Sequence, residues 1–283
     1  MKKFELLCIG HCCHDKTDDG YILGGSVSYA SLIATSLGVN SAVLTSVGKD
    51  FLFKNQFELN HIAFYNIDAD ETTVFENRYA ENQRIQYIHS RAKDISKNHV
   101  PDELCNIPIV LIGSIANEID FILVDKFKNS IMGAIIQGSM RSWDTNGLVY
   151  SQKMDWNKLV DLDLIFLSDD DMRGMETEIP LIVSIVDHVI LTHGEEGVSI
   201  FKGKKKYFYP SYPVLEIDAT GAGDTFSTAY LLAFCKSNDI RYSAIYAHCA
   251  ASIMVEDIGL KNSKSLIGIL ERMEKYHMLF PEY

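Results

Sequence analysis

The segment Asp218–Asp224 combines glycines and a carboxylate at a spacing that suits phosphate chemistry. Gly221 and Gly223 flank one small residue, so the backbone can turn sharply and approach a bulky ligand closely. The apolar run Thr225–Phe234 follows at once and predicts a helix whose free N–H groups and positive dipole end face that turn. Such a helix start binds anions, and phosphate is the usual one.

Asp224 is the unexpected residue of this turn, because a carboxylate would repel a bound phosphate. A base beside an anion site can instead take the proton from a hydroxyl that attacks a phosphoryl group. An ordinary glycine turn with an acidic residue in the first helical turn would show the same pattern. The turn alone therefore leaves phosphoryl transfer and a purely structural role open.

The composition argues against several other classes of protein. The chain has 283 residues, is 47% apolar and carries a formal net charge of −12, so it can bury a large core but lacks the basic character that nucleic-acid binding needs. No uncharged apolar run is long enough to span a membrane, and Glu5 and Gly10 interrupt any signal-peptide core. Six cysteines without regular spacing indicate neither a disulfide framework nor a zinc knuckle. We expect a cytoplasmic protein with no nucleic-acid or membrane partner.

Short apolar runs alternate with segments of helical periodicity along the chain. This alternation predicts βαβ units, and therefore an α/β fold with a mostly parallel sheet that binds ligands at the carboxyl ends of its strands. The predicted strands are Phe4–Gly10, Ser41–Val47, Ile109–Gly113, Ile131–Gln137, Leu164–Ser168 and His188–Thr192. The predicted helices are Ser28–Leu37, Asp120–Lys128, Pro180–Val186, Gly223–Lys236 and Ser243–Glu256.

Two segments depart from this alternation. Residues 72–92 alternate apolar and polar side chains around the polar break Glu81–Gln83, which predicts an antiparallel hairpin with one solvated face. Residues 14–23 are short, polar and contain glycine, and could form a further small strand pair. We predict that both segments form a lid over the ligand edge. No linker or low-complexity tract divides the chain, so we predict a single domain of residues 1–283.

Three ordered motifs resemble those of the ribokinase-like (PfkB) carbohydrate kinase family. Asp218–Asp224 is similar to the family's Asp-Thr-x-Gly-Ala-Gly-Asp, with Ala219 in place of the threonine. Gly24 and Gly25, before a helix start of small residues, are similar to the amino-terminal Gly-Gly motif, and Thr192–Gly197 resembles the Thr-x-Gly-x-x-Gly motif beside the nucleotide. The resemblance covers nearly the whole chain. It implies a three-layer ribokinase-like fold and transfer of the γ-phosphoryl group of ATP, with Mg²⁺, to a hydroxyl of a sugar, polyol or cyclitol.

The resemblance also implies roles for single residues. Asp224 would be the catalytic base, and the backbone N–H groups of Gly221, Ala222 and Gly223 would stabilise charge on the transferred phosphoryl group. Asp171 would act on Mg²⁺, through water. The residues implied to bind the acceptor are Asp15, Gly24, Gly25, Tyr29, Asn77 and Arg141. Those implied to bind the nucleotide are Thr192, Gly194, Gly197, Thr220 and His248.

Some positions differ from the family pattern. Tyr29 stands where members often have an asparagine that contacts the sugar, so a standard ribose pocket is not expected. The family's Asn-x-x-Glu, which organises Mg²⁺, would fall on Ser168–Asp171, where the serine is a weaker partner and Asp171 is one methylene shorter. Ala219 removes a hydroxyl near the monovalent-cation loop of some members, so activation by potassium stays open. His248 stands where many members have an asparagine near the adenine, and a histidine packed between helices would explain it equally well.

Two segments resemble the myo-inositol kinase branch of the family. They are Gly10–Asp15 and Gln137–Asp144, the second being similar to that branch's Gln-Gly-x-x-Arg-x-Trp-Asp. Arg141 could hold a phosphate or a pair of hydroxyls, and Asp15 two vicinal hydroxyls, although a surface ion pair and a surface turn would explain them too. The resemblance therefore makes myo-inositol the best candidate acceptor.

Other functions stay open at this point. A nucleoside kinase would need stacking aromatics, for which the sequence offers Phe75, Tyr79 and Tyr87. A non-catalytic ligand sensor on the same fold is a second alternative. A dinucleotide-dependent oxidoreductase is disfavoured, because Gly10–Cys12 does not supply the glycine pattern that such enzymes have after the first strand. The expected partners are a small hydroxyl compound and ATP, and the protein would be a monomer or a homodimer that pairs through its lid.

Overall fold

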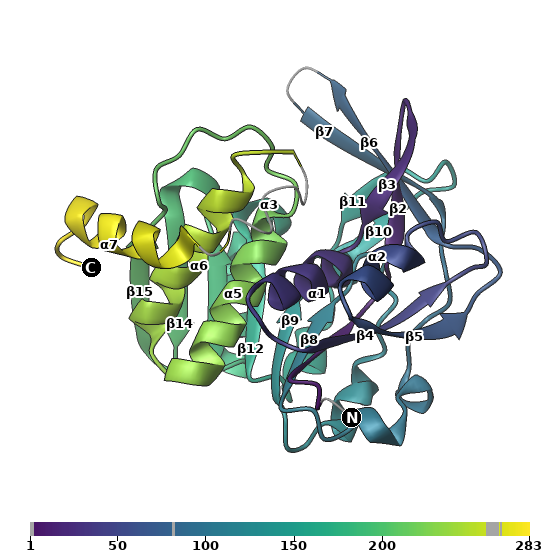
Figure 1. Cartoon of the computed structure of the whole chain (residues 1–283), viewed down its shortest axis with the longest axis horizontal. Helices are drawn as coiled ribbons and strands as arrows, with labels where there is room; N and C mark the ends of the chain where they lie inside the picture. Colours follow the sequence, from purple (N-terminus) through teal and green to yellow (C-terminus); the bar gives the residue numbers. More distant parts are fainter. Residues whose placement is uncertain (1–2, 81–82, 259–265, 267) are drawn as a thin grey trace.

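The computed structural model describes residues 3–80, 83–258, 266 and 268–283, with the backbone alone at 79, 80, 83 and 84. Within these residues, a nine-stranded sheet crosses the molecule in the order β15-β14-β13-β12-β9-β8-β1-β4-β5. Helices cover both faces of this sheet, and a four-stranded sheet projects from it (Figure 1). These layers confirm the predicted α/β class.

The strands of the large sheet are parallel from β5 to β13, and β14 and β15 complete one edge as an antiparallel hairpin. All six predicted strands are present. The parallel strands are β1 (Leu6–Ile9), β4 (Ser41–Val47), β5 (Ala63–Asp68), β8 (Ile109–Gly113), β9 (Ile131–Ile135), β12 (Leu164–Ser168) and β13 (His188–Thr192). The edge hairpin consists of β14 (Gly197–Lys202) and β15 (Lys205–Pro210).

Alternate side chains of the central strands enter two separate cores. Leu6 and Cys8 of β1 pack into one core, whereas Leu7 and Ile9 pack into the other. Strands that are buried on both faces read as continuous apolar runs, which is why these runs marked the strands so clearly in the sequence.

Four helices cover one face of the sheet (Figure 1). They are α1 (Ser26–Ser36), α5 (Ala222–Ser237), α6 (Ile240–Met254) and α7 (Ile269–Leu279). The opposite core includes α4 (Ile179–Ile185) and two 3₁₀ segments, Phe121–Lys126 and Trp156–Leu159. Two further short helices are α2 (Lys54–Leu59) and α3 (Asp169–Met172). In the described ranges no helix has the length and apolar character that crossing a bilayer requires.

The prediction of an ordinary helix at Asp120–Lys128 was wrong, because Phe121–Lys126 forms a 3₁₀ helix. Phe121, Val124 and Phe127 are all buried and lie three residues apart. A helix with three residues per turn brings such a spacing onto one face, so the apolar pattern here fits the tighter form. Strand β5 and helices α2, α3 and α7 lie outside the elements that the sequence predicted.

The small sheet consists of two hairpins joined side by side, in the order β3-β2-β6-β7. Its strands are β2 (Cys13–Thr17), β3 (Gly20–Gly24), β6 (Thr73–Ala80) and β7 (Gln83–Ser90). Both predicted hairpins are therefore present, and β2 pairs with β6 in parallel. Glu81 and Asn82 of the predicted polar break lie outside the described residues. We call this sheet the lid; a short hairpin of β10 (Arg141–Trp143) and β11 (Val149–Ser151) contacts it through β7.

A candidate active site between the sheet edge and the lid

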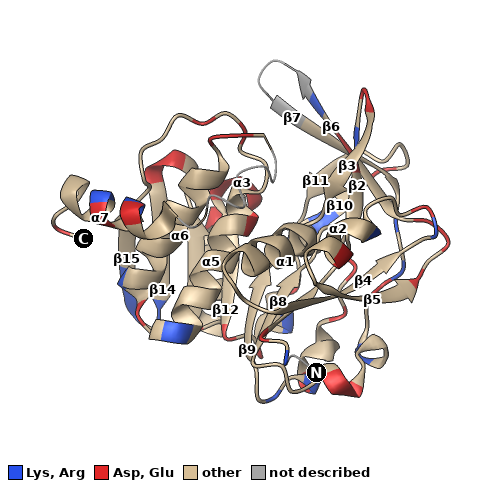
Figure 2. Cartoon of the chain, viewed as in Figure 1, with Lys and Arg blue, Asp and Glu red and all other residues tan. Residues whose placement is uncertain are grey.

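A cavity of about 1010 Å³ lies at the carboxyl ends of the parallel strands, where β9, β12 and β13 meet the lid and the start of α5. Parallel α/β sheets bind ligands at this edge. The cavity is strongly acidic: among the described residues that line it, Arg141 is the only arginine or lysine. Figure 2 shows acidic residues gathered around α3 beside it.

The turn before α5 faces this cavity. Gly221 caps the helix with a φ of 79°, a conformation that glycine adopts without strain. The backbone N–H and hydroxyl of Thr225 donate to the Gly221 carbonyl at 2.8 and 2.7 Å. Gly223 and Asp224 line the cavity in the first turn of the helix, and a Cβ atom added to Gly223 would meet no atom within 4 Å. The helix start is therefore open to a ligand.

Tyr29 of α1 packs directly against this turn. A Cβ atom on Gly221 would lie 2.4 Å from the Tyr29 ring, which is buried beneath it. Burial, together with the charges of Asp15 and Asp224, raises the pKa of the Tyr29 phenol. Tyr29 thus stays neutral and lines the cavity near both acidic residues.

The two positions before α1, Gly24 and Gly25, require glycine for different structural reasons. A Cβ atom on Gly24 would lie 2.4 Å from Oδ2 of Asp15, so this glycine leaves room for the carboxylate. Gly25 has a φ of 97° and caps α1, and a side chain there would strike the backbone of His11. Asp15 therefore lies in the cavity wall at the base of the lid and not in a surface turn.

Arg141 also lies in the cavity wall, where it is half-buried. Its guanidinium donates to the Ile115 carbonyl at 2.9 Å and to Oε1 of Gln137 at 2.8 Å. It lies over the ring of Phe75 of the lid, 5.4 Å from the centroid. Gln137 in turn donates its amide to Oδ1 of Asp171 at 2.7 Å. Because the arginine can only donate and the carboxylate accepts, the orientation of the Gln137 amide is fixed.

Asp171 is held at the start of α3, on the floor of the cavity. Ser168 caps this helix and accepts from the Asp171 backbone N–H at 3.2 Å, while Oδ2 of Asp171 accepts from the Ser168 N–H at 2.9 Å. This reciprocal capping box satisfies both helix-end donors. Among the described residues, no cluster of three or more histidine, cysteine or acidic side chains is placed to ligate a metal ion.

A second cavity of about 550 Å³ adjoins the first across Thr192, Gly194 and Gly223. It is lined in part by Phe226 and His248, whose rings lie 5.0 Å apart. Burial lowers the pKa of His248 to about 4, although a backbone hydrogen bond with Tyr209 acts in the opposite direction. Within the described part of the chain, Nε2 of His248 has no hydrogen-bond partner.

The structure brings the predicted site residues together. Those that line the larger cavity are Asp15, Gly25, Tyr29, Asn77, Arg141, Asp171, Thr192, Gly194, Thr220, Gly221, Gly223 and Asp224. Those that line the second cavity without reaching the first are Gly197, Ala222 and His248, and Gly24 lies against Asp15. Both cavities therefore meet at the turn before α5.

The larger cavity also has lining side chains that were not among the predicted site residues, and three of them make polar contacts with their neighbours. Gln137 orients Arg141, and Gln86 donates to Oδ1 of Asn77 at 2.9 Å. His193 contacts Asp169 and Ser199 through its two ring nitrogens, at 2.6 and 2.8 Å. Gln137 and His193 lie inside segments that the sequence had singled out, so their position next to motif residues was the available signal.

Comparison with known proteins relates part of the chain to a family profile and most of it to several kinases. The pfkB family carbohydrate kinase profile matches residues 167–266. The chain is 24% identical to a nucleoside kinase of Methanocaldococcus jannaschii, over 90% of this chain and 86% of that protein. It is 25% identical to an inositol 3-kinase of Arabidopsis thaliana, over 90% of this chain and 75% of that protein. A ribokinase of Bacillus subtilis is 39% identical over 71 residues, which are 25% of this chain and 24% of that protein.

One similar solved structure is a pyrophosphate-dependent kinase in the ribokinase family, complexed with a pyrophosphate analogue and myo-inositol. It has a TM-score of 0.77 and 22% identity, over 92% of this chain and 98% of that one. This similarity establishes the three-layer ribokinase-like fold. The family profile marks a PfkB family carbohydrate kinase domain at residues 167–266, and the kinase relatives along most of the chain support a phosphotransferase that acts on hydroxyl groups.

Proposed function

We propose that this kinase transfers the γ-phosphoryl group of ATP to a hydroxyl of a cyclitol, polyol or sugar, with myo-inositol as the best candidate acceptor. One observation carries the proposal: a single cavity holds the start of α5 with Asp224, and also Asp15 of β2 and Arg141 of β10. A phosphate site and a hydroxyl-binding site therefore share one space.

In this proposal Asp224 is the general base. Bound beside the helix start, an acceptor hydroxyl would lose its proton to Asp224 as it attacks the phosphoryl group. The backbone N–H groups of Gly221, Ala222 and Gly223 would stabilise the charge that develops on the transferred group. The lid would exclude water, which is a competing nucleophile.

The acceptor side suits a ring that carries several hydroxyls. Asp15 can accept from two neighbouring hydroxyls, while Arg141 can only donate. Tyr29 is larger and more rigid than an amide side chain, so it shapes a wall different from that of a ribose pocket. The relatedness to an inositol 3-kinase adds support for a cyclitol. Asn77, Gly24 and Gly25 complete this side.

The donor side supports ATP over free pyrophosphate. The second cavity adjoins the helix start and offers about 550 Å³ lined by Phe226 and His248, which is room for a nucleoside. Thr192, Gly194, Gly197 and Thr220 would lie along the nucleotide. The described residues of the larger cavity hold no lysine, so polyphosphate would need a metal ion to offset the acidic side chains.

The residues present fit Mg²⁺ bound mainly by phosphate and water, the way this ion is usually held by phosphoryl-transfer enzymes. Each Asp171 oxygen already accepts one hydrogen bond and retains a lone pair for a water of the metal shell. Bound there, Mg²⁺ would neutralise charge on the transferred group. A monovalent cation remains part of the proposal as an option, with Ala219 in the loop concerned. We further propose a cytoplasmic, single-domain enzyme that is a monomer or a lid-paired dimer.

A nucleoside kinase is the second candidate, favoured by the relative in Methanocaldococcus jannaschii. Phe75 lines the cavity, but its ring lies beneath the Arg141 guanidinium. The ring of Tyr87 is covered by the guanidinium of Arg78, and the Tyr79 side chain lies outside the described residues. This arrangement gives a base less stacking surface than the sequence suggested. A non-catalytic sensor would bind the same ligands without turnover.

The deciding experiment is a panel of myo-inositol, other cyclitols, polyols, ribose, fructose and adenosine, each tested with ATP and with pyrophosphate. Acceptor-dependent release of ADP or phosphate is measured, with Asp224→Asn as the negative control. We expect ATP and myo-inositol, or a close cyclitol, to give the highest kcat/KM. Ribose or adenosine as the best acceptor would refute the cyclitol, pyrophosphate as the better donor would refute ATP, and ligand binding without turnover would indicate the sensor.

A further inference from the structure

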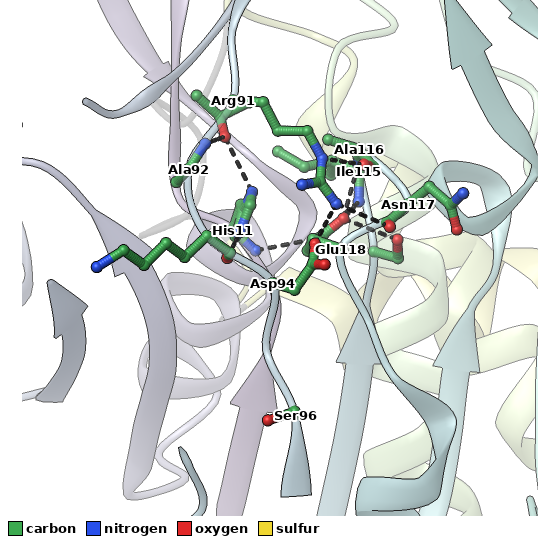
Figure 3. A network of polar contacts seen from close by, with 12 residues as sticks. His11, Arg91, Ala92, Asp94, Ser96, Ile115, Ala116, Asn117 and Glu118 are labelled. Carbon is green, nitrogen blue, oxygen red and sulfur yellow. Dashed lines mark hydrogen bonds and ion pairs between the residues drawn. The ribbon is translucent and has the colours of Figure 1, made fainter. Parts of the chain in front are cut away.

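Glu118 is a buried carboxylate just after the carboxyl end of β8, outside the cavity. It accepts from the backbone N–H groups of His11 at 3.0 Å, Ile115 at 3.1 Å and Ala116 at 2.7 Å, and from the Ser114 hydroxyl at 2.9 Å. Burial acts to raise its pKa, but His11 and these N–H bonds outweigh burial and the pKa is lowered. The charged carboxylate therefore holds the loop of residues 114–118 in one conformation (Figure 3).

His11 connects this carboxylate to the base of the lid. It lies between β1 and β2, and its ring Nε2 donates to the Lys93 carbonyl at 2.7 Å. Its Nδ1 forms a hydrogen bond with the hydroxyl of Thr73, the first residue of β6, at 2.9 Å. The Thr73 oxygen also accepts from the N–H of Ala92, just after β7, at 2.9 Å. The ends of three lid strands thus meet at the ring of His11, whose pKa is lowered by burial although Glu118 acts in the opposite direction.

Arg91 holds the same loop from the other side. Its guanidinium donates to the carbonyl of Ala116 at 2.8 Å and to that of Asn117 at 2.9 Å (Figure 3). Asn117 has a positive φ of 51°, which is costly for a residue with a side chain. Glu118 therefore binds the N–H groups of the loop and Arg91 its carbonyls, so the loop is held from both sides.

The loop in turn contacts the acceptor side of the cavity. The Ile115 carbonyl accepts from one Nη of Arg141, while Gln137 accepts from the other. Gly138 packs so closely on the loop that a Cβ atom there would lie 2.1 Å from the Ser114 carbonyl oxygen. A shift of the loop would therefore displace Arg141 directly.

We propose that Glu118 is a positioning residue for the acceptor: by holding the loop of residues 114–118 against the base of the lid, it fixes the Ile115 carbonyl and with it the orientation of Arg141. Acceptor binding, and not donor binding, depends on this carboxylate. The inference rests on the proposed function, because it concerns how the same cavity binds its hydroxyl acceptor.

The test is Glu118→Gln, which keeps the size of the side chain but points an NH₂ group at N–H donors that need an acceptor. With the best acceptor of the panel, we expect KM for the acceptor to rise about tenfold, the effect of losing one charge-assisted hydrogen bond between a misplaced Arg141 and the acceptor. KM for ATP should stay within about twofold. The matched control is Asp94→Asn, which removes only the exposed ion pair of Arg91 and should leave both constants unchanged.

Arg91→Lys provides a second variant in case Glu118→Gln does not fold, because it keeps the charge but loses the paired contact with two carbonyls. We expect the same selective rise in acceptor KM, smaller in size. The inference would be overturned if the folded variants kept the acceptor KM of the parent protein. It would also be overturned if KM for the acceptor and KM for ATP rose in parallel.

Hydrogen exchange measured without any substrate separates this inference from the proposed function. We expect residues 114–118 and 138–143 to exchange faster in Glu118→Gln than in Asp94→Asn, while the strands of the large sheet keep their protection. If the parent protein phosphorylates nothing in the panel, the proposed function fails and this exchange comparison still decides whether Glu118 positions residues 138–143. Unchanged exchange in both segments would then refute it.

Discussion

At the scale of single residues, the acidic side chains of the larger cavity differ in what holds them. Asp171 is fixed by the capping box of α3 and by Gln137. Asp169 contacts His193, and Asp170 forms an exposed ion pair with Arg173. Asp224 differs from all three because it occupies the first turn of a helix that opens on the cavity. Its position, and not its charge alone, makes it the candidate base.

The first prediction at this scale concerns Asp224→Asn. The amide has the same shape but cannot accept the acceptor's proton, so kcat should fall by about 10²–10⁴-fold, as loss of a general base typically causes. Binding of ATP and of the acceptor, measured by calorimetry, should change little. Asp170→Asn is the control on the same cavity wall and should retain most of the activity. Turnover of Asp224→Asn within a few-fold of the parent would rule out the base.

At the scale of elements, the two glycines at the start of α5, Gly221 and Gly223, have different structural roles. Gly221 carries the positive φ and the contact with Tyr29 of α1, so it joins two helices. Gly223 is already inside α5 and faces open space. One glycine is therefore required by packing, and the other leaves a ligand access to the backbone.

The corresponding prediction compares Gly221→Ala with Gly223→Val. Gly221→Ala should lower the free energy of unfolding by about 1–3 kcal/mol, because the left-handed conformation and the Tyr29 ring both oppose a Cβ atom. Gly223→Val should keep its stability but raise KM for ATP strongly, since the branched side chain blocks the approach of phosphate. Urea unfolding and steady-state kinetics on both variants provide the measurement. A Gly223→Val protein that is unstable yet binds ATP normally would show that this glycine is structural.

At the scale of the whole molecule, the helix layer of α5 and α6 on one face of the sheet encloses two histidines that stay neutral. Burial lowers the pKa of His248 to about 4 and that of His188 to about 3 from an ordinary value of 6.5. His188 contacts the Tyr230 hydroxyl at 2.9 Å. Protonating either histidine would place a charge inside a packed helix layer, so the fold as a whole opposes it.

The prediction at this scale is a loss of stability on mild acidification. Both folded-state pKa values lie below 6.5, so the unfolded chain binds protons more readily as the pH falls from 6.5 towards 4. The free energy of unfolding is therefore highest above that range, and each such histidine lowers it by up to about 1.4 kcal/mol per pH unit within the range.

This effect can be measured by urea unfolding at pH values between about 7.5 and 5, a range that spans the ordinary histidine pKa. His248→Asn should reduce the slope of stability against pH, whereas replacing the exposed His277 with glutamine should leave the slope unchanged. Equal slopes for His248→Asn and the parent protein would show that His248 is charged in the folded state.

Much of this protein follows from its sequence because the signals are local. The strands of the large sheet are buried on both faces, so continuous apolar runs such as Leu164–Ser168 mark them. The turn at Gly221 needs a residue that tolerates a positive φ, and Gly24 must leave room for Asp15. Glycines under such constraints recur at fixed spacing, which is why three short motifs were enough to indicate a kinase of this family.

Only the tertiary structure decided the rest, because those features depend on residues far apart in the chain. Phe121–Lys126 shows apolar spacing that suits two kinds of helix, and packing against the sheet selects the 3₁₀ form. Arg141 could have been a surface residue until Ile115 and Gln137 were seen to hold its guanidinium. Glu118 accepts from His11, which is 107 positions away. A buried carboxylate is stable only where several N–H groups converge on it, and that convergence exists only in the folded chain.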